Sequence, residues 1–322
     1  MCGIIYYKNF TGRPVNRLAL KHYFRQKHRG HEGFGFMGIS GKRLMTCRAT
    51  HESGIKQYLK RHSFSEILFH HRYPTSTSNT IKTTHPIAVS QPLYNHKYYV
   101  IHNGMIYNAH ELKAKHEKMK INYRTSQYRR CRNYWGEIEE DYEFNDSEAL
   151  AHEIALFLDG RQENIEAKGD MAFICLETDR NNNALKLHFA RNNGSPLEMK
   201  NNSHLLVIAS ESLSNQDIPA HTLHTYDYRT GEISHSRIEF PEYSLVGSSS
   251  LYSFWDQLDE IEMSIQEYEE ELNRIENAQL RASVSGNTMR YQRLQRKKDQ
   301  LEEQIGQLYD ERDYMQSIRF DW

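Results

Sequence analysis

The sequence predicts an α/β chain in which a domain of mixed strands and helices, residues 1–248, precedes a helical hairpin, residues 249–322. Two observations lead to this prediction. Short apolar segments such as 4–7, 67–69 and 98–101 alternate with turns rich in glycine and asparagine, as expected for buried strands. After residue 250, apolar residues recur in steps of three and four, which is the spacing of a coiled-coil seam.

The bulk composition excludes several classes of protein. The 322 residues carry a net charge of −1, so no overall field favours nucleic acid or a membrane. Four cysteines without a C-x-x-C pair argue against a zinc ribbon or a disulfide scaffold. The 18 histidines are scattered and show no metal-ligand spacing, so we expect neither metal nor cofactor. The absence of a signal peptide or long apolar run predicts a cytoplasmic protein.

The first five residues, Met1-Cys2-Gly3-Ile4-Ile5, carry the first chemical signal. Removal of Met1 would leave Cys2 with a thiol and a free α-amine on one residue. Their reference pKa values are about 8.5 and about 7.7–8.0, so the amine can accept the thiol's proton near neutral pH. The alternative is that the segment merely begins a buried strand.

Three later motifs have both a structural and a chemical interpretation. The helix candidate 15–26 leads into the glycine-rich turn 28–36. The strand 67–69 leads to Arg72, and an arginine at a sheet rim either binds a carboxylate or joins a surface ion pair. The strand 98–101 ends in Asn103-Gly104, which is an ordinary turn signal. The same pair can also direct an amide and a backbone N–H at one point, as an oxyanion hole requires.

Together these motifs resemble the class II glutamine amidotransferases. The order is Cys-Gly-Ile, H-R-G-x-E-G-x-G, H-x-R-Y-x-T, H-N-G-x-I-x-N and D-S-E-A-L, and the segments 169–173, 191–197 and 209–211 agree with it. The resemblance covers about residues 2–240. It implies the αββα sandwich of the N-terminal-nucleophile hydrolases, with two antiparallel sheets between helical layers. It also implies release of ammonia from L-glutamine.

The resemblance implies a role for each matching residue. Cys2 is the nucleophile with its own α-amine as the general base, and Asn103 and Gly104 form the oxyanion hole. The expected substrate-binding residues are Arg29, Arg72, Thr75 and Asp146. Arg72 and Thr75 would hold the α-carboxylate of glutamine, Asp146 its α-ammonium group, and Arg29 would border the nucleophile.

The sequence departs from the family pattern in several places. Phe69 stands where a glycine is usual, Asn192 replaces a common aspartate, and Glu32 is a tolerable variant of its turn. The segment 113–144 is longer than expected, first basic and aromatic and then acidic. It is either a solvated insertion, such as a hairpin, or a docking surface for a partner.

The C-terminal segment shows two heptad seams separated by a break at 283–288. The seam residues are Phe254, Leu258, Ile261, Ile265, Tyr268, Leu272 and Ile275, then Tyr291, Leu294, Leu301, Ile305, Leu308 and Met315. We expect an antiparallel hairpin that folds on itself, forms a homo-oligomer with a second copy, or binds another protein. Lys298 and Arg312 at seam positions disfavour a fully buried dimer seam.

No segment resembles a synthase domain that would consume the ammonia. The leading interpretation is therefore a glutaminase that acts through a Cys2 thioester and delivers ammonia to a separate synthase or acceptor protein. A second interpretation is a stand-alone hydrolase of another γ-glutamyl amide. A third is a non-catalytic assembly protein, which retention of Met1 or closure of the pocket by Phe69 would favour.

Overall fold

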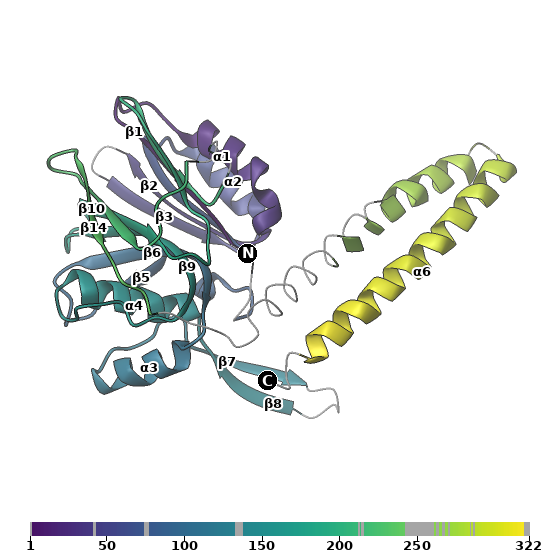
Figure 1. Cartoon of the computed structure of the whole chain (residues 1–322). Coiled ribbons are helices and arrows are strands. Elements are labelled where there is room, and N and C mark those ends of the chain that lie inside the picture. Colours follow the sequence, from purple (N-terminus) through teal and green to yellow (C-terminus); the bar gives the residue numbers. More distant parts are fainter. Residues whose placement is uncertain are drawn as a thin grey trace. The chain divides into compact units, whose positions relative to one another are not determined.

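The computed structural model describes residues 2–40, 43–73, 77–132, 138–211, 213, 216–241, 261, 264–265, 268–269, 271–283, 285 and 287–318. The chain divides into two compact units, Met1–Tyr243 and Ser244–Trp322. The first unit contains the strands and helices α1 to α4, and the second contains a helical hairpin (Figure 1).

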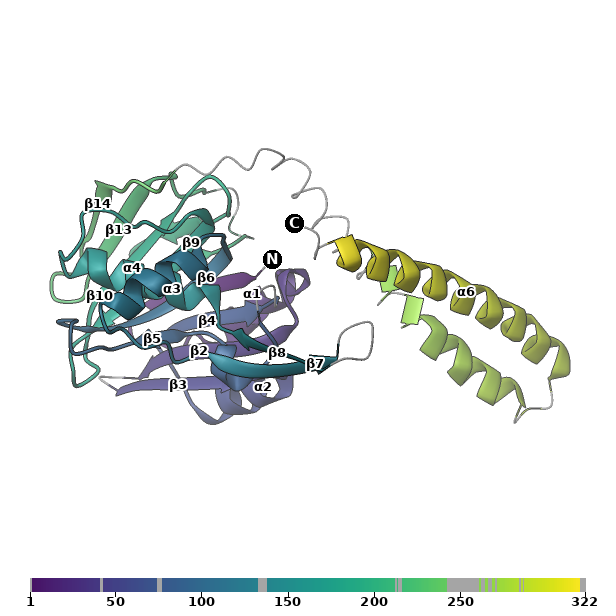
Figure 2. The same ribbon diagram turned by 90° about the horizontal axis from the view of Figure 1, so that it is seen from below.

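The described part of the first unit contains two six-stranded antiparallel sheets. In spatial order, sheet A consists of β11 (Glu198–Asn201), β12 (Leu205–Ala209), β1 (Gly3–Asn9), β4 (Glu66–Arg72), β2 (Glu32–Ser40) and β3 (Arg43–Ala49). Sheet B consists of β14 (Ile233–Arg237), β13 (Thr222–Asp227), β10 (Ala184–Arg191), β9 (Gly169–Thr178), β6 (Lys97–Ile106) and β5 (Ile87–Val89). The two sheets lie face to face (Figures 1 and 2).

Helices cover the outer face of each sheet, which completes the predicted αββα sandwich. The helices α1 (Asn16–Arg25) and α2 (Glu52–Arg61) pack on sheet A, and α3 (Ala109–Lys118) and α4 (Asp146–Leu158) lie on the side of sheet B (Figure 2). Two short 3₁₀ turns, η1 (Lys27–Arg29) and η2 (Ile81–Thr83), interrupt the loops. The predicted fold class is confirmed.

Strand alternation decides which side chains face the space between the sheets. In β1 and β4, Ile4 and Leu68 belong to the apolar core between the sheets, whereas Ile5 and Phe69 belong to the core under α1 and α2. Successive side chains in a strand point to opposite faces. Even-numbered residues at the ends of β1 and β4, including Cys2 and Arg72, therefore face sheet B.

The long segment 113–144 contains the end of α3 and a two-stranded ribbon. The strands β7 (Gln127–Arg132) and β8 (Ile138–Glu143) pair in antiparallel register, with Gln127 opposite Glu143. Residues 133–137 lie outside the described part. The insertion thus includes a hairpin. Its base, at Gln127 and Glu143, accepts hydrogen bonds from the segment 77–83.

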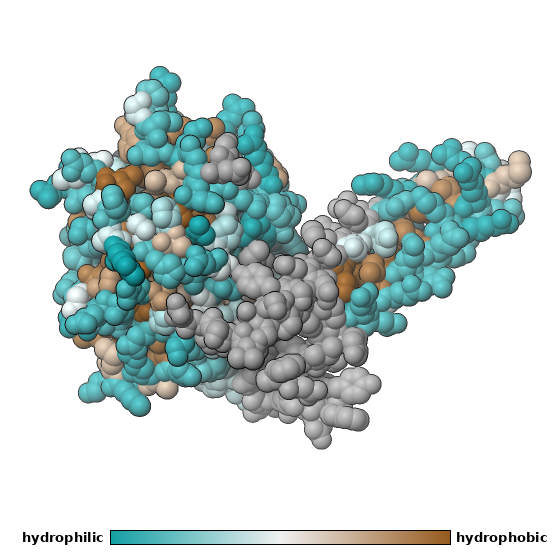
Figure 3. All heavy atoms as spheres, viewed as in Figure 1, coloured by the Kyte–Doolittle hydropathy of each residue, from teal (hydrophilic) through white to brown (hydrophobic). Residues whose placement is uncertain are grey.

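The second unit contains a long helix, α6 (Thr288–Ile318), which packs against helical residues 271–283. Ile275, Leu301 and Ile305 are buried together, so the two predicted seams meet as an antiparallel pair. Hydrophobic residues are visible between the two helices in Figure 3. Tyr291 differs from its prediction, because its side chain is 40% exposed. The predicted seam residues Phe254 and Leu258, and the Met315 side chain, lie outside the described residues.

The two cationic seam residues lie at the edge of this interface. Lys298 Nζ is 2.6 Å from Glu276 Oε1, and the Arg312 guanidinium lies 4.6 Å from the centre of the Tyr309 ring. Long side chains can cover apolar surface in this way while their charge stays in water. Within the described residues, no helix combines the length and apolarity needed to cross a membrane.

Candidate active site

Cys2 lies at the end of sheet A, level with Arg72. Gly3 pairs with His71 in the β1–β4 register, so the preceding residue of β1 is opposite the following residue of β4. Cys2 Sγ is 3.4 Å from the Tyr73 backbone nitrogen and 3.5 Å from its carbonyl oxygen. Burial raises the pKa of the Cys2 thiol, and the Tyr73 N–H and the Arg72 guanidinium act in the opposite direction. The thiol is therefore protonated unless a base removes its proton.

A buried glutamine and a buried histidine hold the main chain behind Cys2. His71 Nδ1 is 2.8 Å from the Gly30 carbonyl oxygen, and Gln26 Nε2 is 3.1 Å from both His71 Nε2 and the Ile4 carbonyl oxygen. Because the Ile4 carbonyl only accepts, the Gln26 atom is the amide nitrogen, and His71 Nε2 must accept from it. His71 is then neutral, which agrees with burial lowering its pKa to about 3.

Arg29 bonds to the main chain of the candidate nucleophile. Its Nε donates to the Cys2 carbonyl oxygen at 3.2 Å, and its Nη1 is 3.2 Å from Glu211 Oε2. Glu211 also contacts His28 Nε2 at 2.7 Å. Arg29 thus lies beside Cys2 and orients its backbone.

Asn103 provides a buried side-chain amide that no described residue hydrogen-bonds. The residue is fully buried, and neither Nδ2 nor Oδ1 has a partner among the described residues. It has the same orientation on β6 as Ile101, which lies in the core between the sheets, so it faces sheet A. An unpaired buried polar group costs about 1–3 kcal/mol. Such an amide is available to a bound molecule.

Gly104 follows with a backbone that a side chain would not permit. Its φ is +134°, and a Cβ at this position would lie 1.8 Å from the Asp170 carbonyl oxygen of β9. Residue 104 must therefore be glycine for β6 and β9 to pair here. His70 Nε2 of β4 lies 3.1 Å from the His102 carbonyl oxygen, which brings the two sheets together directly before Asn103.

Arg72 is buried and its terminal nitrogens are engaged. Nη1 donates to the Ser78 carbonyl oxygen and to Thr83 Oγ1, both at 3.2 Å, and Nη2 donates to the Thr77 carbonyl oxygen at 3.1 Å and to Thr77 Oγ1. Burial lowers the pKa of Arg72, and the charges of Cys2 and Asp146 oppose this shift. The predicted residue Thr75 lies outside the described part of the chain.

Asp146 is the first residue of α4. The Asn145 side chain caps this helix by accepting the Ser147 N–H at 2.9 Å. Asp146 Oδ2 accepts the Ile106 N–H at 2.8 Å, which joins the helix to the end of β6. Asp146 raises the pKa of Cys2, in the same direction as burial does. It also raises the pKa of Arg72, which opposes the larger lowering effect of burial. The Asp146 carboxylate and the Arg72 guanidinium therefore both act electrostatically on the thiol.

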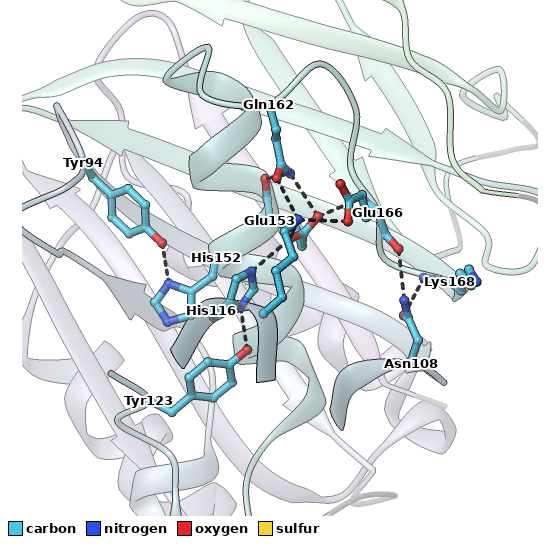
Figure 4. Close-up of polar contacts among 10 residues, drawn as sticks. Tyr94, Asn108, His116, Tyr123, His152, Glu153, Gln162, Glu166 and Lys168 are labelled. Carbon is cyan, nitrogen blue, oxygen red and sulfur yellow. Dashed lines mark hydrogen bonds and ion pairs between the residues drawn. The ribbon is translucent and has the colours of Figure 1, made fainter. Parts of the chain in front are cut away.

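A second buried polar cluster supports α4, which carries Asp146, and its neighbour α3 (Figure 4). Glu153 of α4 is fully buried and accepts from the Glu166 N–H at 2.8 Å; its Oε1 lies 2.9 Å from His116 Nε2. Despite burial, the His116 side chain, the Glu166 N–H and Lys115 lower the pKa of Glu153 to about 2. The cluster joins α3 to α4 and is fully partnered at Glu153, so it is structural.

Two departures from the family pattern have structural explanations. Phe69 packs on Tyr23 of α1 with ring centres 5.5 Å apart, so it faces away from Cys2 and does not close the site. Asn192 Oδ1 accepts the N–H groups of Met171 and Gly194 at 3.0 Å, and its Nδ2 donates to the Gly169 carbonyl at 2.6 Å. An aspartate could not make that last bond.

Several residues near the site were not predicted. Gln26 and His71 are buried behind Cys2, and Ser210 Oγ accepts the Ile4 N–H at 3.0 Å. The only sequence feature that relates to these contacts is the glycine at position 3. The structure explains it, because a Cβ on Gly3 would lie 1.8 Å from His71 Nε2. In the described part of the chain, no three His, Cys, Asp or Glu side chains converge on a metal position.

The comparisons with known proteins agree on the fold. No family model and no curated protein matches the sequence. A solved structure of glutamine phosphoribosylpyrophosphate amidotransferase from B. subtilis, complexed with ADP and GMP, covers 74% of this chain at 18% identity and a TM-score of 0.54. A structure described as the allosteric regulatory enzyme of purine biosynthesis gives the same values. The chain spans about half, 49%, of each of these proteins.

A third similar structure is a glutamine aminotransferase class-II domain protein from Silicibacter pomeroyi. It covers 74% of this chain and 100% of its own at 11% identity and a TM-score of 0.44. At these identities the likeness establishes the fold. The chain has the fold of class II glutamine amidotransferase domains, which confirms the resemblance that the motifs predicted.

Proposed function

We propose that the first unit hydrolyses the side-chain amide of L-glutamine through a γ-glutamyl thioester on Cys2. The observation that carries the proposal is the buried amide of Asn103, which faces the sheet that holds Cys2 and has no hydrogen-bond partner among the described residues. A site built only for stability would satisfy such a group with a partner. An oxyanion that forms during the reaction would satisfy it here.

The substrate's two backbone charges match the charged residues of the site. Glutamine carries an α-carboxylate and an α-ammonium group, which Arg72 and Asp146 bind in this proposal. Each charge-assisted contact contributes about 1.5–3 kcal/mol. The side-chain amide is then directed at the thiol.

The reaction proceeds in two steps. Removal of Met1 frees the α-amine of Cys2, which takes the thiol proton while Sγ attacks the amide carbon. The Asn103 amide and the Gly104 N–H stabilise the oxyanion. The α-ammonium then protonates the substrate's amide nitrogen, the C–N bond breaks, and ammonia leaves the γ-glutamyl thioester on Cys2. A water molecule, deprotonated by the same amine, cleaves the thioester to glutamate and restores the thiol.

In this proposal the ammonia passes to an acceptor that a separate partner protein handles. The helical hairpin of the second unit is the proposed recruitment or homo-oligomer element. We assign it no catalytic role.

The test is ammonia release from glutamine by the full chain. Cys2→Ala is expected to abolish turnover with the thermal unfolding temperature unchanged. Cys47→Ala is the matched control, because Cys47 is a free, partly exposed cysteine on β3, away from the site. Retained turnover in Cys2→Ala would refute the assignment.

A further inference from the structure

The guanidinium of Arg72 is occupied by the loop that follows it. Its four terminal N–H donors bond to Thr77, Ser78 and Thr83. Two acceptors are backbone carbonyls, which cannot turn away without moving the chain. We call residues 77–83 the Arg72 bridge.

The Arg72 bridge is stiffened by its own hydrogen bonds. Thr80 and Thr83 form a capping box around η2, and Thr83 Oγ1 donates to the Ser78 carbonyl oxygen at 2.8 Å. The Thr83 carbonyl oxygen also accepts from Asn145 Nδ2 at 2.7 Å. The bridge therefore holds one shape against Arg72.

The base of the β7–β8 hairpin holds the Arg72 bridge in place. The Ser78 N–H is 3.3 Å from both carboxylate oxygens of Glu143, and Thr80 Oγ1 donates to Gln127 Oε1 at 3.3 Å. Gln127 Nε2 in turn donates to Glu143. These two residues face one another in the ribbon. The hairpin is thus linked to Arg72 through a single layer of residues.

The same hairpin base places a negative charge near Arg72. Burial lowers the pKa of Arg72, and the Glu143 carboxylate is among the charges that oppose this shift. A carboxylate ligand of Arg72 would meet repulsion from Glu143 and competition from the carbonyls of Thr77 and Ser78. Both effects weaken its binding.

We propose that Gln127 and Glu143 set the affinity of the site for the substrate's α-carboxylate by holding the Arg72 bridge on the guanidinium. This inference rests on the proposed glutaminase function. Displacement of the hairpin base releases Ser78 and Thr80, and with them the donors of Arg72. Glutamine affinity is then coupled to the position of the β7–β8 hairpin.

The test is calorimetric titration of L-glutamine into full-length Cys2→Ala protein, which binds without turnover. In this background, Glu143→Gln and Gln127→Leu are each expected to tighten glutamine binding about three- to tenfold, which corresponds to about 0.6–1.4 kcal/mol. Gln127→Leu changes no charge, so its effect isolates the mechanical link. Glu163→Gln, at an exposed carboxylate in the loop after α4, is the control and leaves the Kd unchanged.

The outcomes separate this inference from the proposed function. If the Cys2→Ala protein binds glutamine and Gln127→Leu leaves that binding unchanged or weaker, only the role of the Arg72 bridge is overturned. Tighter binding in Glu143→Gln only, lost at high salt, means that charge acts without the bridge and also overturns it. No binding of glutamine to the parent or any variant overturns the proposed function, and this inference with it. If either Glu143→Gln or Gln127→Leu lacks a cooperative unfolding transition and is therefore misfolded, the other variant decides.

Discussion

The imidazole of His71 lies against Gly3 so closely that a Cβ on Gly3 would fall 1.8 Å from Nε2. The histidine is fixed by the Gly30 carbonyl on one side and by the Gln26 amide on the other. It cannot move aside without breaking both bonds. The position of the residue before Gly3, which is Cys2, therefore depends on a neutral histidine behind it.

Gly3→Ala should displace the start of β1 from His71. We expect loss of most glutaminase activity and a fall of a few kcal/mol in the free energy of unfolding, typical of a forced clash in a core. Gly306→Ala is the matched control, because a Cβ there meets no other atom and alanine favours a helix by about 0.8–1 kcal/mol. Chemical denaturation and ammonia release measure both. Full activity in Gly3→Ala would contradict the packing argument.

Asn103→Ala should separate catalysis from stability. The rate of ammonia release is expected to fall about 10²–10³-fold, as for other lost oxyanion donors. The free energy of unfolding should stay within about 1 kcal/mol of its original value, because no described hydrogen bond to the Asn103 side chain is lost. Single-turnover kinetics and urea denaturation give the two numbers. Unimpaired turnover would remove Asn103 from the mechanism.

Asp146→Asn should weaken substrate binding more than folding. An asparagine oxygen can still accept the Ile106 N–H, but the amide does not neutralise an α-ammonium group. We expect KM for glutamine to rise about 10- to 100-fold, equivalent to about 1.5–3 kcal/mol. Steady-state kinetics test this. An unchanged KM would mean that Asp146 only joins α4 to β6.

Acid should destabilise the first unit between about pH 6.5 and pH 3. Burial lowers the pKa of His71 and His152 to about 3, so both bind a proton in the unfolded chain before they do in the folded one. The contribution of the two histidines to the free energy of unfolding is complete above about pH 6.5 and is lost as the pH falls from 6.5 to 3. Glu153, with its pKa lowered to about 2, extends the loss below pH 4.5. A melting temperature that is flat from pH 7 to pH 4 would contradict this.

Leu301→Ala should affect the second unit and leave the chemistry intact. Leu301 is 5% exposed and packs with Ile275 and Ile305, and such truncations cost about 2–5 kcal/mol. We expect earlier melting of the helical hairpin in circular dichroism and unchanged turnover of glutamine by the full chain. A parallel loss of turnover would show that the hairpin contributes to the site.

The sequence predicted the architecture well because its motifs lie at strand ends. The strand candidates 4–7, 67–69 and 98–101 fall within β1, β4 and β6, and the helix candidate 15–26 corresponds to α1. Arg72 and Asp146, to which the family resemblance assigned the two ends of glutamine, lie close enough to Cys2 to affect the pKa of its thiol.

The sequence did not predict which side chains and loops contact one another in the folded chain. Gln26 is a polar residue at the end of a helix, and nothing in its local sequence shows that it reaches His71. Likewise, Arg72 was expected to present free donors, but Thr77, Ser78 and Thr83 occupy them. Which acceptors meet a guanidinium depends on loop geometry, which periodicity does not encode.

The proposed function requires Cys2 to be an N-terminal nucleophile that reacts with glutamine. Intact-mass spectrometry of the purified protein, before and after treatment with 6-diazo-5-oxo-norleucine, tests it most directly. We expect loss of one methionine and a single adduct that maps to Cys2 and is prevented by excess glutamine. A protein that retains Met1 and gains no adduct would contradict the claim.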